Sequence, residues 1–437
     1  MLPKKLTYSL LIIVVAKILL ATFFPLVADE AYYYVWSLRP QLSYYDHPGM
    51  VSWLIYIGTH LLPFKDPLTV RFMFIALSSL TLYVWLLILR KTNFSEKLTY
   101  LFVLLYCLNP MLGAGSILAT PDVPLVFFWS LSYFFFIQLL EEKKWHWYFL
   151  FGASLGLGFC SKYLIVLFVI SGIVALLITK KYKNLWPKGV LITVFSGLIF
   201  SSPVLIWNYN NEWISFLFQL KHGYGRSYYE PEWTYGYLLG QFFILSPLIF
   251  IQLFKKPHSL DRYFSLTQIL FFITSTFKSV VEANWAITSY AHGITNFTQN
   301  ASRRLIKYTL LYWGFIYIAL FVFLTTPGGT KALKNQPTSS DVIALRGLSE
   351  KYQPLYGPTY QISSLITWDQ QKLVPKLKGL SRLDFFDHMP ESIPTEKTIY
   401  VLKYKDTEWP ESTKGADLKQ LDQFDDLGLE LFRVTYE

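Results

Sequence analysis

Long apolar runs alternate with short polar or basic segments through the first three quarters of the 437-residue chain. A helix of about 20 predominantly apolar residues is long enough to cross the hydrocarbon core of a bilayer. The 285–300 run is the most polar of the set, so we expect it to face protein rather than lipid. The pattern predicts eleven transmembrane helices, at residues 6–28, 67–90, 98–113, 122–140, 146–160, 163–179, 189–206, 234–254, 263–277, 285–300 and 307–325.

Basic residues gather in alternate loops between these runs, beginning with Lys4 and Lys5 before the first one. Cytoplasmic loops carry an excess of Lys and Arg, so the N-terminus is predicted to be cytoplasmic. Residues 50–64 are apolar but too short to span, and counting them as a span would reverse every later loop. We therefore predict an interfacial or re-entrant helix there, within a long first outer loop. The first apolar run exceeds the length of a signal-peptide core, which favours a retained anchor.

The composition changes after Thr326, where Pro327-Gly328-Gly329 is expected to end the last helix. The chain thus divides into a membrane domain, residues 1–326, and a small extracytoplasmic α/β domain, residues 327–437. The fold class is mainly α and polytopic, with this soluble domain appended. Within the tail, the pattern predicts strands at 398–404 and 429–436 and helices at 341–352 and 361–373.

Composition agrees with a membrane protein, since 53% of residues are hydrophobic and 16% are charged. The net charge of +10 lies in the membrane part, because residues 331–437 carry 14 Lys and Arg against 16 Asp and Glu. The charge therefore reports topology, and no nucleic-acid partner is expected. Cys107 and Cys160 lie in apolar runs and are predicted to be packing residues. Lys17, inside the first run, is predicted to make a helix–helix contact or a local pair rather than to act in catalysis.

The pair Asp29-Glu30 directly follows the first apolar run, where two adjacent carboxylates are costly and usually functional. Four further outer loops also carry unusual polar residues. A single one has an ordinary explanation: Asp122 could cap a helix, and Lys162 could extend to lipid headgroups. Their occurrence on one face favours a common site. Besides Asp29 and Glu30, the first loop carries Arg39, Tyr45, Asp46 and His47, and the four further loops carry Asp122, Lys162, His222, Arg226 and Asn284.

These residue types suit group transfer from a phosphorylated lipid. A carboxylate such as Asp29 or Glu30 can act as general base on an acceptor hydroxyl. Asp46, Asp122 and His222 have the ligand types of a divalent ion, which would be zinc, magnesium or manganese. Lys162 and Arg226 can bind phosphate through charge-assisted hydrogen bonds.

The order of short motifs resembles bacterial glycosyltransferases of the dolichyl-phosphate-mannose protein mannosyltransferase type, in the GT-C class. The class includes the lipid A aminoarabinose transferases. The similarity covers nearly all of the membrane domain and continues faintly at Thr359-Tyr360-Gln361 and Ser381-Arg382. The motifs are Asp-Glu-Ala-Tyr-Tyr (29–33), Tyr-Tyr-Asp-His-Pro (44–48), Thr-Pro-Asp-Val-Pro (120–124), Ser-Lys-Tyr (161–163), Trp-Ile-Ser-Phe (213–216), Gln-Leu-Lys-His-Gly (219–223) and Asn-Trp (284–285).

The resemblance implies that Asp29 is the catalytic aspartate and that Asp46, Asp122 and His222 occupy metal-ligand positions. It also implies that Lys162 faces the lipid phosphate, with Arg226 near an arginine of similar role. Asp46 replaces a glutamate of the aminoarabinose transferases, and His47 replaces a lysine. Arg39, Tyr45, His47 and Asn284 join Lys162 and Arg226 as predicted substrate-binding residues.

The predicted function is transfer of one sugar from a polyprenyl-phosphate donor to an acceptor at the outer face of the bacterial inner membrane. Lipid A or the lipopolysaccharide core glycan is the expected acceptor, and a protein hydroxyl is the alternative within the class. Surrounding membrane lipids are further expected partners. A transporter or flippase is the alternative from another class, but it should show paired halves with broken helices, and no internal repeat is visible. A non-catalytic scaffold would leave the loop carboxylates unexplained.

Overall fold

The computed structural model describes residues 4–255, 258–326 and 337–436, so the predicted Pro327-Gly328-Gly329 break lies outside the described residues. Contacts divide the chain into two compact units. The first, called here the helical unit, comprises Met1–Ala21, Leu42–Val51 and Arg71–Phe321. The second, the mixed unit, comprises Thr22–Gln41, Ser52–Val70 and Val322–Glu437. Two segments of the predicted first outer loop therefore group with the C-terminal residues, which the sequence-based domain division did not foresee.

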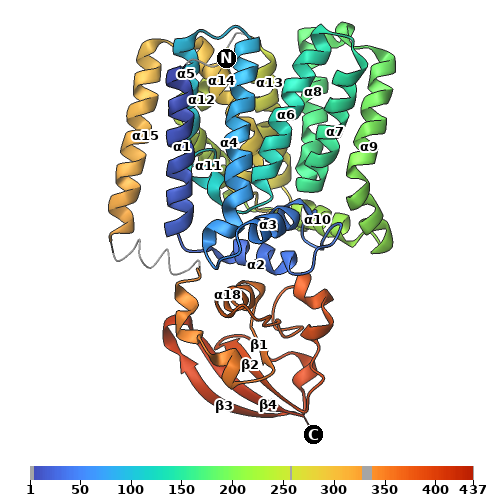
Figure 1. Cartoon of the computed structure of the whole chain (residues 1–437), viewed down its shortest axis with the longest axis vertical. Coiled ribbons are helices and arrows are strands. Elements are labelled where there is room, and N and C mark those ends of the chain that lie inside the picture. Colours follow the sequence, from blue (N-terminus) through green and yellow to red (C-terminus); the bar gives the residue numbers. More distant parts are fainter. Residues whose placement is uncertain (1–3, 256–257, 327–336, 437) are drawn as a thin grey trace. The chain divides into compact units, whose positions relative to one another are not determined.

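Each of the eleven predicted apolar runs contains helix (Figure 1). The helices are α1 (Lys4–Phe23), α4 (Pro67–Lys91), α5 (Glu96–Leu108), α6 (Asp122–Glu141), α7 (Trp145–Ser161), α8 (Val166–Thr179), α9 (Pro187–Asn210), α11 (Pro231–Leu245), α12 (Pro247–Gln252), α13 (Leu260–Thr276), α14 (Tyr290–Asn300) and α15 (Arg303–Leu324). A further helix, α10 (Ile214–Tyr224), lies between α9 and α11.

Several predicted boundaries were wrong in detail. The first helix ends at Phe23 rather than at residue 28, and α5 ends at Leu108 rather than at residue 113. The 234–254 run is two helices, because Ser246 has φ of 76° and Pro247 follows it. The 285–300 run begins with a 3₁₀ helix, η4 (Ala283–Ser289), before α14.

Within the described residues, α1, α4, α6, α9 and α15 are long and apolar enough to cross a membrane. The other helices of the helical unit are shorter or more polar. The architecture of a multi-pass membrane protein is thus confirmed, while the count of eleven spans stays a prediction. The interfacial helix expected at 50–64 is present as α3 (Met50–Leu61), and its position at a membrane surface also stays a prediction.

Small residues allow α7 and α9 to pack closely. A side chain at Gly152 would collide with Thr193 and Ser196 of α9, and one at Gly156 with Gly197 and Phe200. Close approach at small residues is how helices associate in lipid, where burial of apolar surface provides no driving force. The intramembrane Lys17 behaves as predicted, since its Nζ donates to Ser78 Oγ of α4 at 2.9 Å.

The mixed unit contains a four-stranded sheet of order β1-β2-β4-β3 (Figure 1). Its strands are β1 (Leu355–Tyr356), β2 (Thr398–Tyr404), β3 (Asp417–Phe424) and β4 (Leu429–Thr435). β1 pairs with β2 in parallel, and the other two pairings are antiparallel. The predictions of β2 and β4 are confirmed. The 341–352 helix is instead a 3₁₀ turn, η5 (Asp341–Leu345), followed by the short α17 (Leu348–Lys351).

Helix α2 (Ala28–Ser37) packs against α18 (Tyr360–Gln370) within the mixed unit. Tyr34 lies edge-on to Trp368 at 4.9 Å between ring centres, and its hydroxyl donates to Gln371. Main-chain pairing adds to this packing, because Ser339 N donates to the carbonyl of Leu26 at 2.8 Å. The aromatic residues after Asp29-Glu30 are therefore a packing surface for the C-terminal residues.

Candidate active site

Asp122 joins three segments of the helical unit that are far apart in sequence. Its Oδ1 accepts a hydrogen bond from Lys162 Nζ at 2.8 Å, and its Oδ2 accepts one from Asn284 Nδ2 at 2.8 Å. The side chains of Asp122 and Lys162 are only 10% and 9% exposed, so this is a buried ion pair. Three of the predicted site residues are thus assembled in one cluster.

Local sequence explains how the cluster forms. Pro121 precedes Asp122, the first residue of α6, so the carboxylate lies at the positive end of the helix dipole. Lys162 ends α7 with an extended backbone, φ −159°. The next residue, Tyr163, is anchored by a 2.8 Å hydrogen bond between its hydroxyl and Ser215 Oγ of α10. The short turn between α7 and α8 is therefore held firmly enough to aim the ammonium at Asp122.

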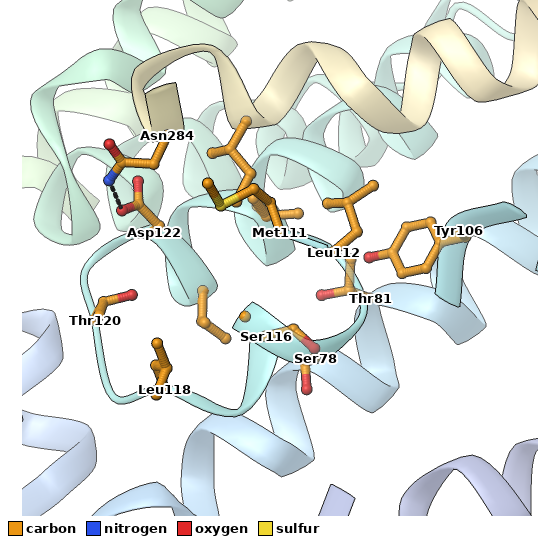
Figure 2. Close-up of a pocket in the computed structure, with 14 residues that line it drawn as sticks. Ser78, Thr81, Tyr106, Met111, Leu112, Ser116, Leu118, Thr120, Asp122 and Asn284 are labelled. Carbon is orange, nitrogen blue, oxygen red and sulfur yellow. Dashed lines mark hydrogen bonds between the residues drawn. The ribbon is translucent and has the colours of Figure 1, made fainter. Parts of the chain in front are cut away.

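A cavity of about 130 Å³ lies beside this cluster (Figure 2). Asp122 and Asn284 are at one end of its lining, joined by their hydrogen bond. Apolar side chains form most of the rest of the wall, with several hydroxyl groups among them. The lining includes Ser78, Thr81, Tyr106, Met111, Leu112, Ser116, Leu118, Thr120, Val123, Val126 and Ile287. A largely apolar wall with a small number of placed polar groups is typical of small-molecule sites.

The second cluster of predicted residues lies on α10. Tyr45 packs on Phe218 with 4.7 Å between ring centres, and the Gln219 amide donates to the main-chain oxygen of Asp46. One helical turn beyond Phe218, His222 stacks on it and lies 5.5 Å from Trp285. The Tyr-Tyr-Asp-His-Pro turn, closed by a hydrogen bond from Tyr44 N to the carbonyl of His47, is thus brought to the helix that carries His222.

The arrangement of Asp46, Asp122 and His222 does not fit a shared metal ion. Both oxygens of Asp122 accept hydrogen bonds from Lys162 and Asn284. Across the described ranges, no three His, Cys, Asp or Glu side chains lie together as ligands would. We therefore assign no reaction step to an ion. The metal site stays a prediction, which elemental analysis of the purified protein can check.

Arg226 follows α10 and is held by aromatic rings. Its guanidinium carbon lies 4.7 Å from the ring centre of Trp233 and 6.0 Å from that of Tyr228. Its main-chain N–H donates to the carbonyl of Lys278 at 3.1 Å. The side chain is exposed, so stacking orients the guanidinium without burying its charge.

Asp29 and Glu30, in the mixed unit, have different surroundings. Glu30 is fully buried, and its Oε2 accepts a hydrogen bond from the main-chain N–H of Val27 at 3.1 Å. This bond satisfies a donor that the start of α2 would otherwise leave unpaired. Asp29 is exposed, and its Oδ1 accepts a 3.2 Å hydrogen bond from the hydroxyl of Tyr360. Of the two predicted catalytic residues, Asp29 is the one whose carboxylate faces outward.

Arg39, whose role in substrate binding stays a prediction, pairs with Glu391 through two hydrogen bonds. These bonds raise the pKa of Arg39 and lower the pKa of Glu391. Both side chains are about 40% exposed, so the pair contributes little to stability. The pair connects the end of α2 with the C-terminal residues.

Replacing Glu30 with alanine is expected to destabilise the mixed unit by about 1 kcal/mol while leaving the transfer rate close to wild type. The physical reason is that the carboxylate accepts from Val27 N and is buried away from substrate. Thermal unfolding and initial transfer rates measure the two effects. Glu30→Gln is the matched control, because an amide oxygen can accept the same bond. Loss of activity in Glu30→Gln with unchanged stability would instead assign the base to Glu30.

Sequence reasoning missed two groups of residues at these sites. Gln219 was quoted only as part of a motif, although it holds the Asp46 turn. Tyr360 and Arg382 appeared only as a faint continuation of the family pattern, although Tyr360 contacts Asp29. Burial raises the pKa of Tyr360, and the adjacent Asp29 raises it further, so the hydroxyl remains a donor at neutral pH. No local pattern could show this contact, since 331 residues separate the partners.

The fold is that of the GT-C glycosyltransferases. The crystal structure of ArnT from Cupriavidus metallidurans bound to undecaprenyl phosphate superposes with a TM-score of 0.71 and 12% identity, covering 99% of this chain and 98% of ArnT. ArnT in the apo state gives the same TM-score, with 13% identity. These likenesses establish the shared fold and leave the substrate open.

Residues 46–207 match the model of the dolichyl-phosphate-mannose-protein mannosyltransferase family. The lipid A galacturonosyltransferase RgtD of Rhizobium johnstonii is 24% identical over 281 residues, which cover 61% of this chain and 58% of RgtD. The chain thus aligns with less than two thirds of that relative's length. The resemblance drawn from the motifs is confirmed by the family match and by the fold.

Proposed function

We propose that this protein is an integral inner-membrane glycosyltransferase that transfers a single sugar from a polyprenyl-phosphate donor to lipid A or lipopolysaccharide core. The observation that carries the proposal is the buried Asp122–Lys162–Asn284 cluster beside a cavity whose largely apolar wall includes several hydroxyl groups. These groups match the chemistry of a phosphorylated sugar. The relatives support the two substrates, since RgtD is a lipid A galacturonosyltransferase and ArnT was crystallised with undecaprenyl phosphate.

The reaction requires one bond to form and one to break. The acceptor oxygen bonds to the anomeric carbon of the sugar, while the bond from that carbon to the phosphate oxygen breaks. Asp29 takes the proton of the acceptor hydroxyl, which its exposed carboxylate can reach from the aqueous side. The polyprenyl phosphate leaves with the electron pair and one additional negative charge.

The leaving phosphate is stabilised by cationic groups of the helical unit. An ammonium has three N–H donors, and the pair with Asp122 uses one of those of Lys162. The guanidinium of Arg226 is exposed and oriented by Trp233. Charged groups that are already in place do not have to reorganise as charge develops on the phosphate. Such electrostatic preorganisation is usually the largest contribution to catalysis.

The distribution of Lys and Arg among the loops supports a membrane orientation for the chain. Basic residues gather in alternate loops, so we propose a cytoplasmic N-terminus and a periplasmic C-terminus. Asp29, at the end of the first span, is then on the periplasmic side. Acceptor transfer would occur at the outer face of the membrane.

Protein O-glycosylation is the second candidate. The reason is that residues 46–207 match a family described as protein mannosyltransferases. The donor chemistry would be the same, and a serine or threonine hydroxyl would replace the glycolipid acceptor.

Mass spectrometry of lipid A, core oligosaccharide and glycoproteins from cells with and without the gene tests the proposal. We expect one sugar to disappear from lipid A or core and to return when the wild-type gene is restored. Loss confined to glycoproteins would favour the second candidate. Three unchanged fractions, together with no transfer by the purified protein from polyprenyl-phosphate sugars, would overturn both.

A further inference from the structure

A series of contacts leads from Asp29 into the C-terminal residues of the mixed unit. The Tyr360 hydroxyl donates to Asp29 Oδ1 at 3.2 Å, and the guanidinium carbon of Arg382 lies 4.8 Å from the centre of the Tyr360 ring. The Tyr32 ring also lies near that ring, at 4.4 Å between centres. Tyr360 therefore contacts an aromatic ring of α2 and a cation while it donates to the proposed base.

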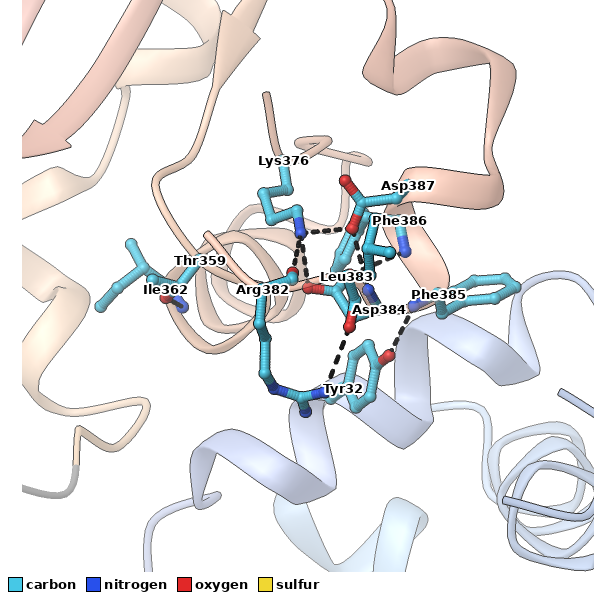
Figure 3. Close-up of polar contacts among 10 residues, drawn as sticks. All are labelled: Tyr32, Thr359, Ile362, Lys376, Arg382, Leu383, Asp384, Phe385, Phe386 and Asp387. Atoms are coloured by element: carbon cyan, nitrogen blue, oxygen red, sulfur yellow. Dashed lines mark hydrogen bonds and ion pairs between the residues drawn. The ribbon is translucent and has the colours of Figure 1, made fainter. Parts of the chain in front are cut away.

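The segment that carries Arg382 is fixed by a buried ion cluster (Figure 3). Lys376 Nζ donates to Asp384 Oδ2 and to the main-chain oxygen of Arg382, each at 2.7 Å, and also to Asp387. The three ionic side chains are between 0% and 1% exposed. Burial raises the pKa of Asp384 to about 6, against the opposing effect of Lys376.

The same segment is attached to α2. The main-chain N–H of Phe385 donates to the Tyr32 hydroxyl at 2.8 Å, and the Phe385 ring lies 5.9 Å from that of Trp36. Residues three apart share one face of a helix, so Tyr32 and Asp29 lie on the same side of α2. The ion cluster thus fixes the position of Arg382 and Tyr360 relative to the face that carries Asp29.

A buried ion cluster contributes little net stability to a small domain, because removing its charges from water costs free energy. Desolvation of the charges can exceed their attraction, and apolar residues of similar volume often serve equally well. The cluster also fixes the main chain at Arg382, since Lys376 donates a hydrogen bond to the Arg382 carbonyl. Fixed supporting groups are what a reacting side chain requires to keep its geometry.

We propose that Tyr360 and Arg382 are positioning residues for Asp29, and that the Lys376–Asp384–Asp387 cluster holds them in place. The C-terminal residues would then take part in the transfer reaction rather than form an appended domain. This inference rests on the proposed function, in which Asp29 is the base. The hydroxyl of Tyr360 orients the carboxylate and favours its ionised form, because a hydrogen bond donated to a carboxylate stabilises the charge.

Tyr360→Phe tests the inference through the pH dependence of transfer. We expect kcat/KM for the acceptor to fall by about tenfold, the value of one hydrogen bond to a charged group. The acidic limb of the pH–rate profile should move to higher pH, since the base then holds its proton more tightly. Tyr34→Phe is the matched control: it lies on α2 and its hydroxyl bonds to Gln371, not to Asp29. Its profile should coincide with wild type.

Two further variants test the ion cluster. Lys376→Met should shift the same limb and also lower the unfolding temperature, because it leaves two buried carboxylates without their cation. If that protein fails to accumulate, Arg382→Gln serves instead, since Arg382 is exposed and its loss should not unfold the domain. A shift of the limb in Arg382→Gln at unchanged unfolding temperature supports a positioning role.

The outcomes separate this inference from the proposed function. An active wild type, an inactive Asp29→Asn and an unshifted Tyr360→Phe would overturn the positioning role alone. A wild type without transfer, or an active Asp29→Asn, would remove the proposed role of Asp29 and this inference with it.

Discussion

Replacing Asp29 with asparagine is expected to lower the rate of sugar transfer by about 10²- to 10⁴-fold, the usual contribution of a general base. Asparagine has nearly the same shape, and its amide oxygen can still accept the hydrogen bond from Tyr360. The fold and donor binding should therefore remain intact. Single-turnover transfer by purified protein, with donor and acceptor saturating, measures the chemical step directly.

Glu30→Gln is the control for Asp29→Asn, because it makes the same acid-to-amide change at the adjacent position. Glu30 is buried and accepts from Val27 N, whereas Asp29 is exposed. Only the Asp29 variant should lose activity. Near-normal single-turnover transfer by Asp29→Asn would remove Asp29 as the base.

Lys162→Met is expected to destabilise the helical unit by about 3–5 kcal/mol, because it leaves the buried Asp122 carboxylate without its cation. The Asn284 amide would remain as a partner but carries no charge. Replacing both members, as in Lys162→Met with Asp122→Asn, should restore much of the loss. Thermal unfolding of the detergent-solubilised variants gives the coupling through a double-mutant cycle.

Lys221→Met is the matched control for this prediction, since Lys221 is an exposed lysine of α10. Its replacement should change stability by less than about 0.5 kcal/mol, as is usual at the surface. Equal effects of the two lysine substitutions would show that the Asp122–Lys162 pair is not formed in the membrane protein. Additive single and double variants would lead to the same conclusion.

The membrane helices could be predicted because their signal is local. A run of about 20 apolar residues has few alternatives to a helix in lipid, where every main-chain polar group needs an internal partner. All eleven predicted runs accordingly contain helix, and errors are confined to ends and to the break at Ser246. Strand β3 was missed because its sequence carries no such local signal. It is an exposed edge strand, and its sequence Asp-Leu-Lys-Gln-Leu-Asp-Gln-Phe lacks the regular apolar alternation that marks a half-buried strand.

The site residues were predicted as a set of chemical types, but their partners were not. Lys162 was expected to face a phosphate and Asp122 a metal ion, and no sequence pattern showed that the two form a buried pair. Arg39 was expected to bind substrate, and its pairing with Glu391 was likewise not foreseen. In each case the partner is at least 40 residues away along the chain. Sequence patterns show which side chains are unusual for their surroundings, and they contain no information on which distant group neutralises them.

The sequence by itself determined the class of this protein: a multi-pass membrane protein with a small α/β tail, and with carboxylates and isolated basic residues in its predicted outer loops. The length of an apolar run and the excess of Lys and Arg in a loop are properties of single segments. They determine membrane insertion and orientation without any contact between segments. Only the tertiary structure decided which charges are buried together, that Glu30 caps a helix while Asp29 faces outward, and that Tyr360 reaches Asp29. Those outcomes depend on desolvation and on hydrogen bonds between distant segments, and both arise only when the chain has folded.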